Sequence, residues 1–178
     1  SKNDKENIEN IINLKKNDTC INEYSNEIFV NLLIEEFNSI KNNLNYDNKI
    51  LTDYGINPSI RSCLIDSLFG LQDTFKFCDK TLFITVQIFD TYLSININNN
   101  KENKILETDL DIILVGSFLI ASKTEESFIY HLTDYLTILS EKYNKNHLIN
   151  MEYNMLKIFN FETFQPTALD FLEILINI

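Results

Sequence analysis

The stretch Thr108–Glu126, TDLDIILVGSFLIASKTEE, decides the fold of this 178-residue chain. Its central part, Leu110–Ala121, is apolar at nearly every position, and Asp111 is its one charged break. A helix that is hydrophobic all round has to be enclosed, because any face turned to water would expose several large side chains. We therefore expect a buried central helix. Neighbouring helices can approach it closely at its small residues, Gly116, Ser117, Ala121 and Ser122.

The composition favours a packed helical domain. Hydrophobic residues make up 44% of the chain, with 13 Phe and 8 Tyr, which is enough for a substantial core. The 3 Gly and 2 Pro are too few for a β-rich fold with many tight turns. We predict an all-α protein of one domain with an extension.

The charge excludes one class of partner. The formal net charge is -11, and no basic stripe is present. Binding to nucleic acid needs clustered Lys and Arg to neutralise phosphates, so we expect no nucleic-acid partner. No apolar signal segment begins the chain, and the central apolar run is too short to span a membrane. We therefore expect an intracellular protein, in the nucleus, the cytoplasm or both, with no membrane partner.

Helical periodicity and capping residues predict the other elements. Asn57-Pro58 is a strong helix start, with Asn as N-cap and Pro at the first helical position. Asp79 is expected to cap the next helix, and Thr108 or Asp109 the central one. The buried stripe of the helix after Asp79 is predicted as Leu82, Phe83, Val86, Phe89, Tyr92 and Leu93. The predicted helices cover 26–41, 57–77, 79–93, 108–125, 128–139 and 144–159, with a last one from about 167.

These elements define the predicted domain organisation. Residues 1–25 form a polar extension, which is either a docked amphipathic helix or a disordered arm. Residues 26–56 hold one helix and a polar linker. Residues 57–164 form a domain of five helices around the buried third helix, with 94–107 as a solvated loop. Residues 165–178 begin a further helix.

No constellation of residues indicates an enzyme. The three glycines lie far apart in the sequence, so no glycine-rich phosphate loop exists. His131 and His147 have no partners at metal-ligand spacing, and no nucleophile–base pattern is present. The cysteines are odd in number and also lack metal-like spacing, so we expect free thiols, no metal and no cofactor. They are Cys20, Cys63 and Cys78.

One charged pair is expected inside the fold. Arg61, the single arginine of the chain, lies within an apolar helical pattern, as does Asp90 in the following helix. A charged side chain beside buried positions usually needs a partner of opposite charge. We predict an ion pair between Arg61 and Asp90.

With these residues in place, the chain resembles a cyclin box, the helical domain of the cyclins. The order of the motifs matches the family's M-R-A-I-L-V-D, Y-I-D-R-F-L-S, L-V-G…A-S-K-x-E-E and M-E-x-x-[IV]-L-x-x-L patterns. The resemblance covers 26–178. The matching stretches are Ile60–Asp66, Phe89–Ser94, Leu114–Gly116 with Ala121–Glu126, and Met151–Lys157, followed by Phe161 and Pro166-Thr167.

The resemblance implies a binding site for a cyclin-dependent kinase. In cyclins, the lysine of A-S-K-x-E-E and the glutamate of M-E-x-x bind the αC, PSTAIRE-type helix of the kinase, and here they are Lys123 and Glu152. An ammonium donates to backbone carbonyls and a carboxylate accepts backbone N–H groups, both as charge-assisted hydrogen bonds. The alternative is that Lys123 and Glu152 only pair with each other. The other residues assigned to this site are Leu156, Phe161, Glu125 and Glu126.

The chain departs from the cyclin pattern in two places. Cyclins that dock R-x-L substrate motifs use a patch with a tryptophan, and Ser67 stands at that position. The chain has no Trp, so we expect weak or absent R-x-L docking. The chain also ends where a second box would begin, so that box is either absent or lies beyond residue 178. The remaining positions of the patch are Ile60, Cys63 and Leu64.

Two functions remain open from the sequence. The resemblance implies a regulatory subunit that binds and activates a cyclin-dependent kinase in cell-cycle or transcription control, with kinase substrates or inhibitors as further partners. The alternative is a cyclin-fold adaptor that does not activate a kinase, which the missing tryptophan favours. A nucleic-acid-bound relative of the same fold is disfavoured by the acidic charge.

Overall fold

The computed structural model describes residues 23–41, 57–99, 107–163 and 166–176, and every regular element in these ranges is helical. The all-α prediction is therefore confirmed. The elements are α2 (Glu23–Lys41), α4 (Pro58–Phe75), α5 (Asp79–Asn99), the 3-10 helix η1 (Glu107–Asp109), α6 (Leu110–Glu125), α7 (Leu132–Leu136), α8 (Lys145–Ile158) and α9 (Ala168–Ile176).

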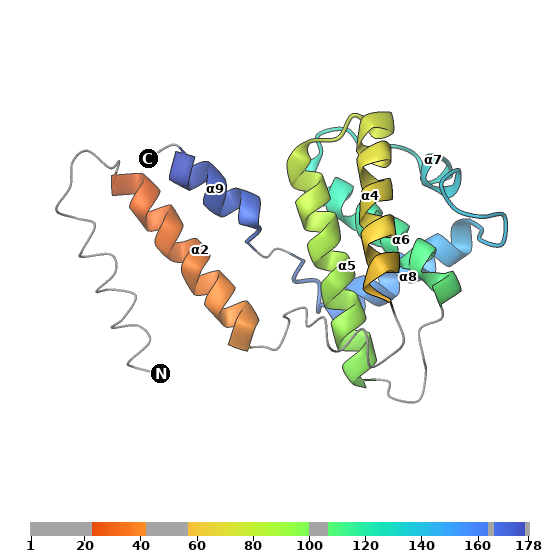
Figure 1. The fold of residues 1–178 in the computed structure, drawn as a ribbon, viewed down its shortest axis with the longest axis horizontal. Helices are drawn as coiled ribbons and strands as arrows, with labels where there is room; N and C mark the ends of the chain where they lie inside the picture. The colour runs from red at the N-terminus through yellow and green to blue at the C-terminus, as the bar shows by residue number, and fades with distance from the viewer. Residues whose placement is uncertain (1–22, 42–56, 100–106, 164–165, 177–178) are drawn as a thin grey trace.

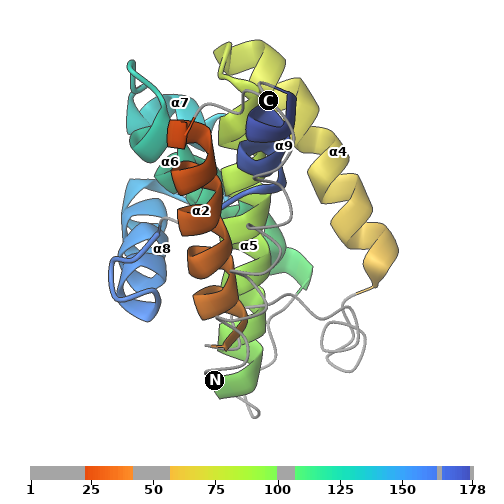
Figure 2. The same ribbon diagram turned by 90° about the vertical axis from the view of Figure 1, so that its left-hand side faces the viewer.

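Two groups of helices make up the described fold. Helices α4 to α8 form a bundle, and α2 lies beside α9 at one side of it (Figure 1). Figure 2, turned by 90°, shows α2 and α9 in front of α5. Helix α9 contacts both α2 and α5. The edge-to-face contact of Phe29 with Phe171, with ring centroids 6.0 Å apart, is part of the packing between α2 and α9.

Helix α6 is the buried centre of the bundle, as the apolar run predicts. Leu110 and all residues from 112 to 122 are buried, whereas Asp111 is exposed. Helices α5 and α8 pack along α6. Each buried leucine, isoleucine or phenylalanine contributes about 1.5–3 kcal/mol relative to exposure, so this enclosure is the largest source of stability in the bundle.

Helix α8 approaches α6 closely at Gly116. A Cβ atom added at Gly116 would lie 3.0 Å from Met151 Cγ and 3.3 Å from Met155 Sδ. Both methionine side chains belong to α8, and Met155 is fully buried. The predicted role of this small residue in close helix packing is confirmed, because any larger residue has to displace these methionines.

We expect Gly116→Val to lower the free energy of unfolding by about 1–3 kcal/mol through overpacking against α8. Gly70→Val is the matched control, because nothing lies within 4 Å of a Cβ at Gly70. The control should leave stability unchanged or slightly higher, since valine is a better helix former than glycine. Urea denaturation followed by circular dichroism measures both. Equal losses of unfolding free energy in the two variants would contradict the close approach of α8 to α6 at Gly116.

A cluster of aromatic rings joins the end of α4 to α6 and α7. Phe75 packs on Phe118 with ring centroids 5.6 Å apart and on Tyr135 at 5.2 Å. Tyr135 is fully buried, and its hydroxyl forms a 2.7 Å hydrogen bond with Ser122 Oγ on α6. A buried tyrosine needs such a partner, so the small polar residue near the end of α6 has a packing role.

Two helix starts follow the capping rules of the sequence. Asn57 precedes α4, and its side-chain oxygen accepts from Ser59 N at 2.9 Å, with Pro58 at the first helical position. Asn144 precedes α8 in the same way and accepts from His147 N at 3.1 Å. The cap predicted at Asn57 is confirmed, and Asn144 is a cap at the start predicted for the helix over 144–159, because an N-cap acts through contacts within one turn.

The predicted helix over 128–139 is wrong for most of its length. Only α7 is helical in this range, and Phe128 is 69% exposed before it. His131 and Asp134 form a capping box, in which His131 N donates to Asp134 Oδ2 at 2.9 Å. This local cap starts the helix at Leu132, while the Tyr130 hydroxyl donates to the carbonyl oxygen of Phe75 and ties the non-helical segment before α7 to the end of α4.

Helix α5 also differs from its prediction. It continues through Asn99, so the beginning of the loop predicted over 94–107 is wrong, and 100–106 lies outside the described residues. Phe83, predicted in the buried stripe, is 43% exposed, whereas Thr81 and Thr85 are fully buried. Threonine is tolerated there because its hydroxyl can bond within the helix: Thr85 Oγ1 donates to the carbonyl of Thr81 at 2.7 Å.

Asp109 precedes α6 without capping it through its side chain. It occupies the N-cap position but makes no side-chain capping hydrogen bond, because its carboxylate accepts from the Tyr143 hydroxyl at 3.2 Å. The carbonyl of Thr108 also accepts from Tyr143, at 2.8 Å. Of the extension predicted over 1–25, residues 1–22 lie outside the described residues, while 23–25 belong to α2, which begins three residues before the predicted helix. The linker over 42–56 also lies outside the described residues.

Candidate functional site

Lys123 and Glu152 meet at one end of the bundle. Lys123 lies in the last turn of α6 and Glu152 in the middle of α8, and Lys123 Nζ donates to Glu152 Oε1 at 2.5 Å. The lysine side chain is 40% exposed and the glutamate side chain 15%. The structure therefore brings together the two charged residues assigned to kinase binding, as an ion pair at the surface.

The apolar residues assigned to this site follow Glu152 along the chain. Leu156 is one turn further on α8 and packs partly against the core. Phe161 is 67% exposed and has a left-handed backbone with φ 64°, as does Asn160 with φ 52°. The N–H of Phe161 donates to the carbonyl of Leu156 at 2.8 Å, which closes the end of α8. This turn leaves a large aromatic ring on the surface after α8.

The two glutamates after Lys123 are directed toward α5. Glu126 Oε1 accepts from Cys78 N at 2.8 Å and from Thr81 Oγ1 at 2.5 Å. These donors lie at the start of α5, where the helix dipole favours a negative charge. Glu125 lies 3.6 Å from Lys80 Nζ. In the structure, Glu126 therefore fastens the end of α6 to the start of α5, while Glu125 stays partly exposed.

Lys80 and Asp170 extend this network to α9, and the sequence analysis missed both. Lys80 Nζ lies 3.1 Å from Asp170 Oδ1. Asp170 Oδ2 accepts from both Thr167 N and Thr167 Oγ1 at 2.7 Å, a capping arrangement that the T-x-x-D spacing could have indicated. Burial opposes ionisation of Asp170, but hydrogen bonds from Thr167 and Lys80 outweigh it and lower the pKa of the carboxyl.

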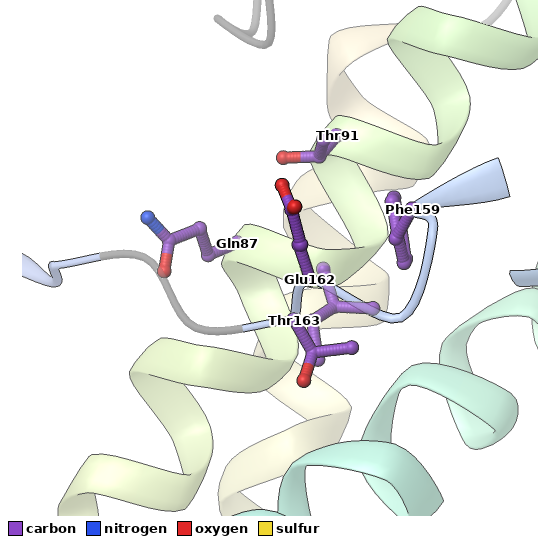
Figure 3. A pocket seen from close by; sticks show the side chains of 6 residues that line it. Gln87, Thr91, Phe159, Glu162 and Thr163 are labelled. Atoms are coloured by element: carbon purple, nitrogen blue, oxygen red, sulfur yellow. The ribbon is translucent and has the colours of Figure 1, made fainter. Parts of the chain in front are cut away.

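A small cavity lies where the chain after α8 crosses α5. It is lined by Gln87 and Thr91 of α5 and by Phe159, Glu162 and Thr163, and Figure 3 shows the Glu162 carboxylate near the Thr91 hydroxyl. Its volume is about 10 Å³, close to the space needed for one water molecule. Gln87 Nε2 donates to the carbonyl of Pro166 at 3.0 Å and ties the connector to α5. The cavity is too small to hold a substrate.

Arg61 and Asp90 form a bidentate pair between α4 and α5. Arg61 Nε donates to Asp90 Oδ1 at 2.8 Å, and Nη2 donates to Oδ2 at 2.6 Å. The side chains are 23% and 10% exposed, so the pair is largely removed from water. Burial raises the pKa of Asp90, and the hydrogen bonds and charge of Arg61 offset part of that rise.

The four positions of the predicted docking patch share one face of α4. Ile60 and Leu64 are partly buried and pack against the core, whereas Cys63 and Ser67 are exposed. Ser67 Oγ donates to the carbonyl of Leu64 at 2.6 Å. The side chain at the tryptophan position is therefore small and bonded within its own helix, so it adds little apolar area to the patch.

The described residues offer no site for a metal. Among them, no group of three or more His, Cys, Asp or Glu side chains is arranged to hold an ion. Both histidines serve helix starts: His131 precedes α7, and His147 Nδ1 accepts from Asn144 N at 3.2 Å. Within the same ranges, no helix is long and apolar enough to cross a membrane. Cys63 and Cys78 are free thiols, and Cys20 lies outside the described residues.

Comparison with known proteins identifies the class. Residues 27–163, which are most of the chain, match the family model described as "Cyclin, N-terminal domain". The chain therefore belongs to the cyclin family, and the helical bundle described above is its N-terminal cyclin box.

Similar proteins come from several kingdoms. The chain is 30% identical to the G2/mitotic-specific cyclin-B of Spisula solidissima over 94% of its own length and 36% of that protein. It is 31% identical to S-phase entry cyclin-5 of Saccharomyces cerevisiae over 90% of its length and 35% of that protein. It is 33% identical to Cyclin-A1-2 of Arabidopsis thaliana over 83% of its length and 31% of that protein. The chain thus spans about a third of the length of these relatives.

We expect Arg61→Met to lower the free energy of unfolding by about 3–5 kcal/mol near neutral pH, because it leaves the Asp90 carboxylate buried without its partner. Without Arg61 the pKa of Asp90 rises further above its value in the unfolded chain, so the folded state binds a proton there more readily. The loss is therefore greatest at high pH and shrinks as the pH falls toward the pKa of the unfolded chain.

Urea denaturation near neutral pH and near about pH 4.5 measures this difference. The double variant Arg61→Met/Asp90→Asn is the control, because it removes the buried charge. It should regain much of the stability at neutral pH and lose the pH dependence of the single variant. A loss of equal size at both pH values would show that Arg61 contributes through packing and not through Asp90.

Proposed function

We propose that the chain is the regulatory subunit of a cyclin-dependent protein kinase, which it binds and activates by holding the αC, PSTAIRE-type helix of the kinase. The observation that carries this proposal is the ion pair of an exposed Lys123 and a largely buried Glu152 where α6 and α8 meet. Membership of the cyclin family supports it. The names of the relatives, G2/mitotic-specific cyclin-B and S-phase entry cyclin-5, favour a role in cell division.

The ion pair is compatible with kinase binding. Partly exposed pairs contribute only about 0–1 kcal/mol to stability, so Lys123 and Glu152 can turn to a partner at little cost. Lys123 would donate to backbone carbonyls of the kinase helix, and Glu152 would accept its backbone N–H groups. In the unbound chain, Lys123 and Glu152 hold each other near the positions that binding of the kinase helix would require. The mutual pairing of Lys123 and Glu152, which the sequence analysis gave as the alternative, would thus be the unbound form of the kinase-binding site.

The surroundings of the pair fit a helix-binding surface. Leu156 and the exposed ring of Phe161 lie along the chain after Glu152 and would add apolar contact. Glu125 is partly exposed beside Lys80, and Glu126 holds the end of α6 in place through α5. A kinase helix held inward completes the kinase's own Lys–Glu pair and its magnesium site, which is how binding would raise activity. This role places the protein inside the cell, in the nucleus, the cytoplasm or both.

We expect Lys123→Ala/Glu152→Ala to weaken binding to a purified cyclin-dependent kinase with a PSTAIRE-type helix by at least about 100-fold, since each central charged contact is worth about 2–5 kcal/mol. Calorimetry measures the affinity, and phosphorylation of a peptide substrate measures the activation. Glu141→Ala/Lys145→Ala is the matched control, because it removes one charge of each sign from exposed positions elsewhere. Unchanged affinity and activation in the first variant would refute the proposal.

The swapped variant Lys123→Glu/Glu152→Lys separates kinase contact from a purely structural pair. It keeps two opposite charges facing each other, so thermal stability should stay within about 1 kcal/mol of the parent chain. Kinase binding should still be lost, because the donor and the acceptor of the kinase helix have changed places. Full kinase binding by the swapped variant would mean that the two residues serve only the fold.

The second candidate function is a cyclin-fold adaptor that does not activate a kinase. The observation that favours it is Ser67, which leaves the docking patch without its large apolar residue. Such a chain would scaffold other proteins or bind a kinase unproductively. Kinase substrates or inhibitors would be further partners only under the first function. Stimulation of a bound kinase on a peptide substrate would exclude the adaptor.

A further inference from the structure

Helices α2 and α9 form a pair that is set apart from the bundle. Helix α2 packs chiefly on α9, through contacts such as that of Phe29 with Phe171, and α9 in turn contacts α5. Figure 1 shows the two helices side by side, away from the other helices. We call this pair the α2–α9 arm. Its connection to the bundle therefore passes mainly through the contact of α9 with α5.

The arm is joined to the bundle with little buried apolar surface. No residue of α9 is fully buried, and Leu172, Leu175 and Ile176 are 50%, 51% and 72% exposed. Among the described residues, the core cluster and the apolar side chains packed on it include none from α2 or α9. Hydrophobic stabilisation scales with the apolar area removed from water, so polar contacts carry a large share of the docking of the arm.

Lys80 makes a charged contact between the bundle and the arm. It lies in the first turn of α5, and its Nζ is 3.1 Å from Asp170 Oδ1 on α9. The side chains are 27% and 12% exposed, so most of the surface of the pair is shielded from water. Solvent and salt weaken a partly buried pair less than a fully exposed one, so this contact can hold α9 on α5.

The charges around Lys80 favour this position. Glu125 Oε2, at the end of α6, lies 3.6 Å from Lys80 Nζ, and Glu173 adds a further negative charge on α9. Burial lowers the pKa of Lys80, but its hydrogen bond to Asp170 and the three carboxylates around it outweigh that effect and raise the pKa. Lys80 is thus a cation held among three carboxylates, two of which belong to α9.

The connector before α9 is fixed separately from Lys80. Gln87 Nε2 donates to the carbonyl of Pro166 at 3.0 Å, which ties the connector to α5. Thr167 is buried, and its N–H and hydroxyl both donate to Asp170 Oδ2 as the cap of α9. Asp170 therefore uses Oδ2 for its own helix and Oδ1 for Lys80. Lys80 joins the helix itself to α5, at a point beyond the fixed connector.

We propose that the α2–α9 arm is a movable unit of this chain and that Lys80 is the latch that holds it on the bundle. In the closed form Lys80 joins α5 to Asp170. When the charge of Lys80 is removed or screened, α9 swings away from α5 about the connector at Pro166, with α2 still packed on it. The bundle stays folded in the open form, because its core cluster contains no described residue of the arm. The inference concerns the chain alone and does not rest on the kinase proposal.

The test is amide hydrogen exchange of the whole chain, read by mass spectrometry on peptides from α2, α6 and α9. A helix of 9 residues, such as α9, is marginal in water once it is undocked, so its amides exchange when the arm opens. Lys80→Met removes the charge and keeps an unbranched side chain. It should speed exchange in α9 and in α2 at least about fivefold, because it removes a charge-assisted hydrogen bond. Exchange in α6 should stay unchanged.

Two control variants make the test specific. Lys145→Met removes the same charge from an exposed position at the start of α8, and it should leave exchange in α9 within about twofold of the parent chain. Lys80→Arg keeps the charge beside Asp170 and should also stay within about twofold. A general loss of stability would speed exchange in α6 as well, so α6 distinguishes a latch from a residue that only supports the fold.

Salt should open the latch in the parent chain. Raising the ionic strength from about 0.01 to 1 M shortens the screening length from about 30 to 3 Å. Exchange in α9 should therefore become faster relative to α6 in the parent chain. In Lys80→Met the ratio of the two rates should change much less, because the charged contact is already absent.

Four results would each overturn the proposal. The first is exchange in α9 that Lys80→Met leaves unchanged. The second is equal acceleration of α6 and α9, which would make the arm part of the cooperative unit of the bundle. The third is faster exchange in α9 without α2, which would show that the two helices do not move together. The fourth is an effect of Lys145→Met as large as that of Lys80→Met, which would assign the change to net charge.

Discussion

The enclosure of α6 on every side is the constraint on which the other elements depend. An unbroken run of buried residues from 112 to 122 needs neighbours around the whole helix, and α5 and α8 supply most of them. Helix α8 packs closely on α6 because Gly116 has no side chain that would collide with Met151 and Met155 of α8. A core packed this tightly has little freedom to deform, so the position of the last turn of α6 is set by the whole bundle.

The rigid core fixes the position of the candidate site, because Lys123 belongs to the last turn of the buried helix α6. Lys123 emerges from the last turn of α6 toward α8, while Glu126 turns back toward the start of α5. The pair of Arg61 and Asp90 joins α4 to α5 on another side of the bundle. Buried or partly buried contacts thus hold the helices that carry Lys123 and Glu152, of which the lysine is exposed and the glutamate largely buried.

Much of the fold could be predicted from residues near one another in the chain, but the site could not. Caps such as Asn57 and Asn144 act within one turn, and the apolar run of α6 has only one stable environment. Lys123 and Glu152 were identified by the resemblance to cyclins, since no rule of spacing distinguishes them from other surface charges. The capping box that starts α7 at Leu132 also involves residues within one turn of the chain. The sequence analysis missed it because the apolar pattern of the predicted helix over 128–139 continues past it.

The sequence by itself determined an all-α domain around one buried helix, because the hydrophobic run of 110–121 cannot face water in any other arrangement. Apart from the predicted pair of Arg61 and Asp90, only the tertiary structure decided which side chains meet. Phe83 faces outward while Thr81 is buried, and Glu126 bonds to the start of α5, because these outcomes depend on the rotation of whole helices against one another.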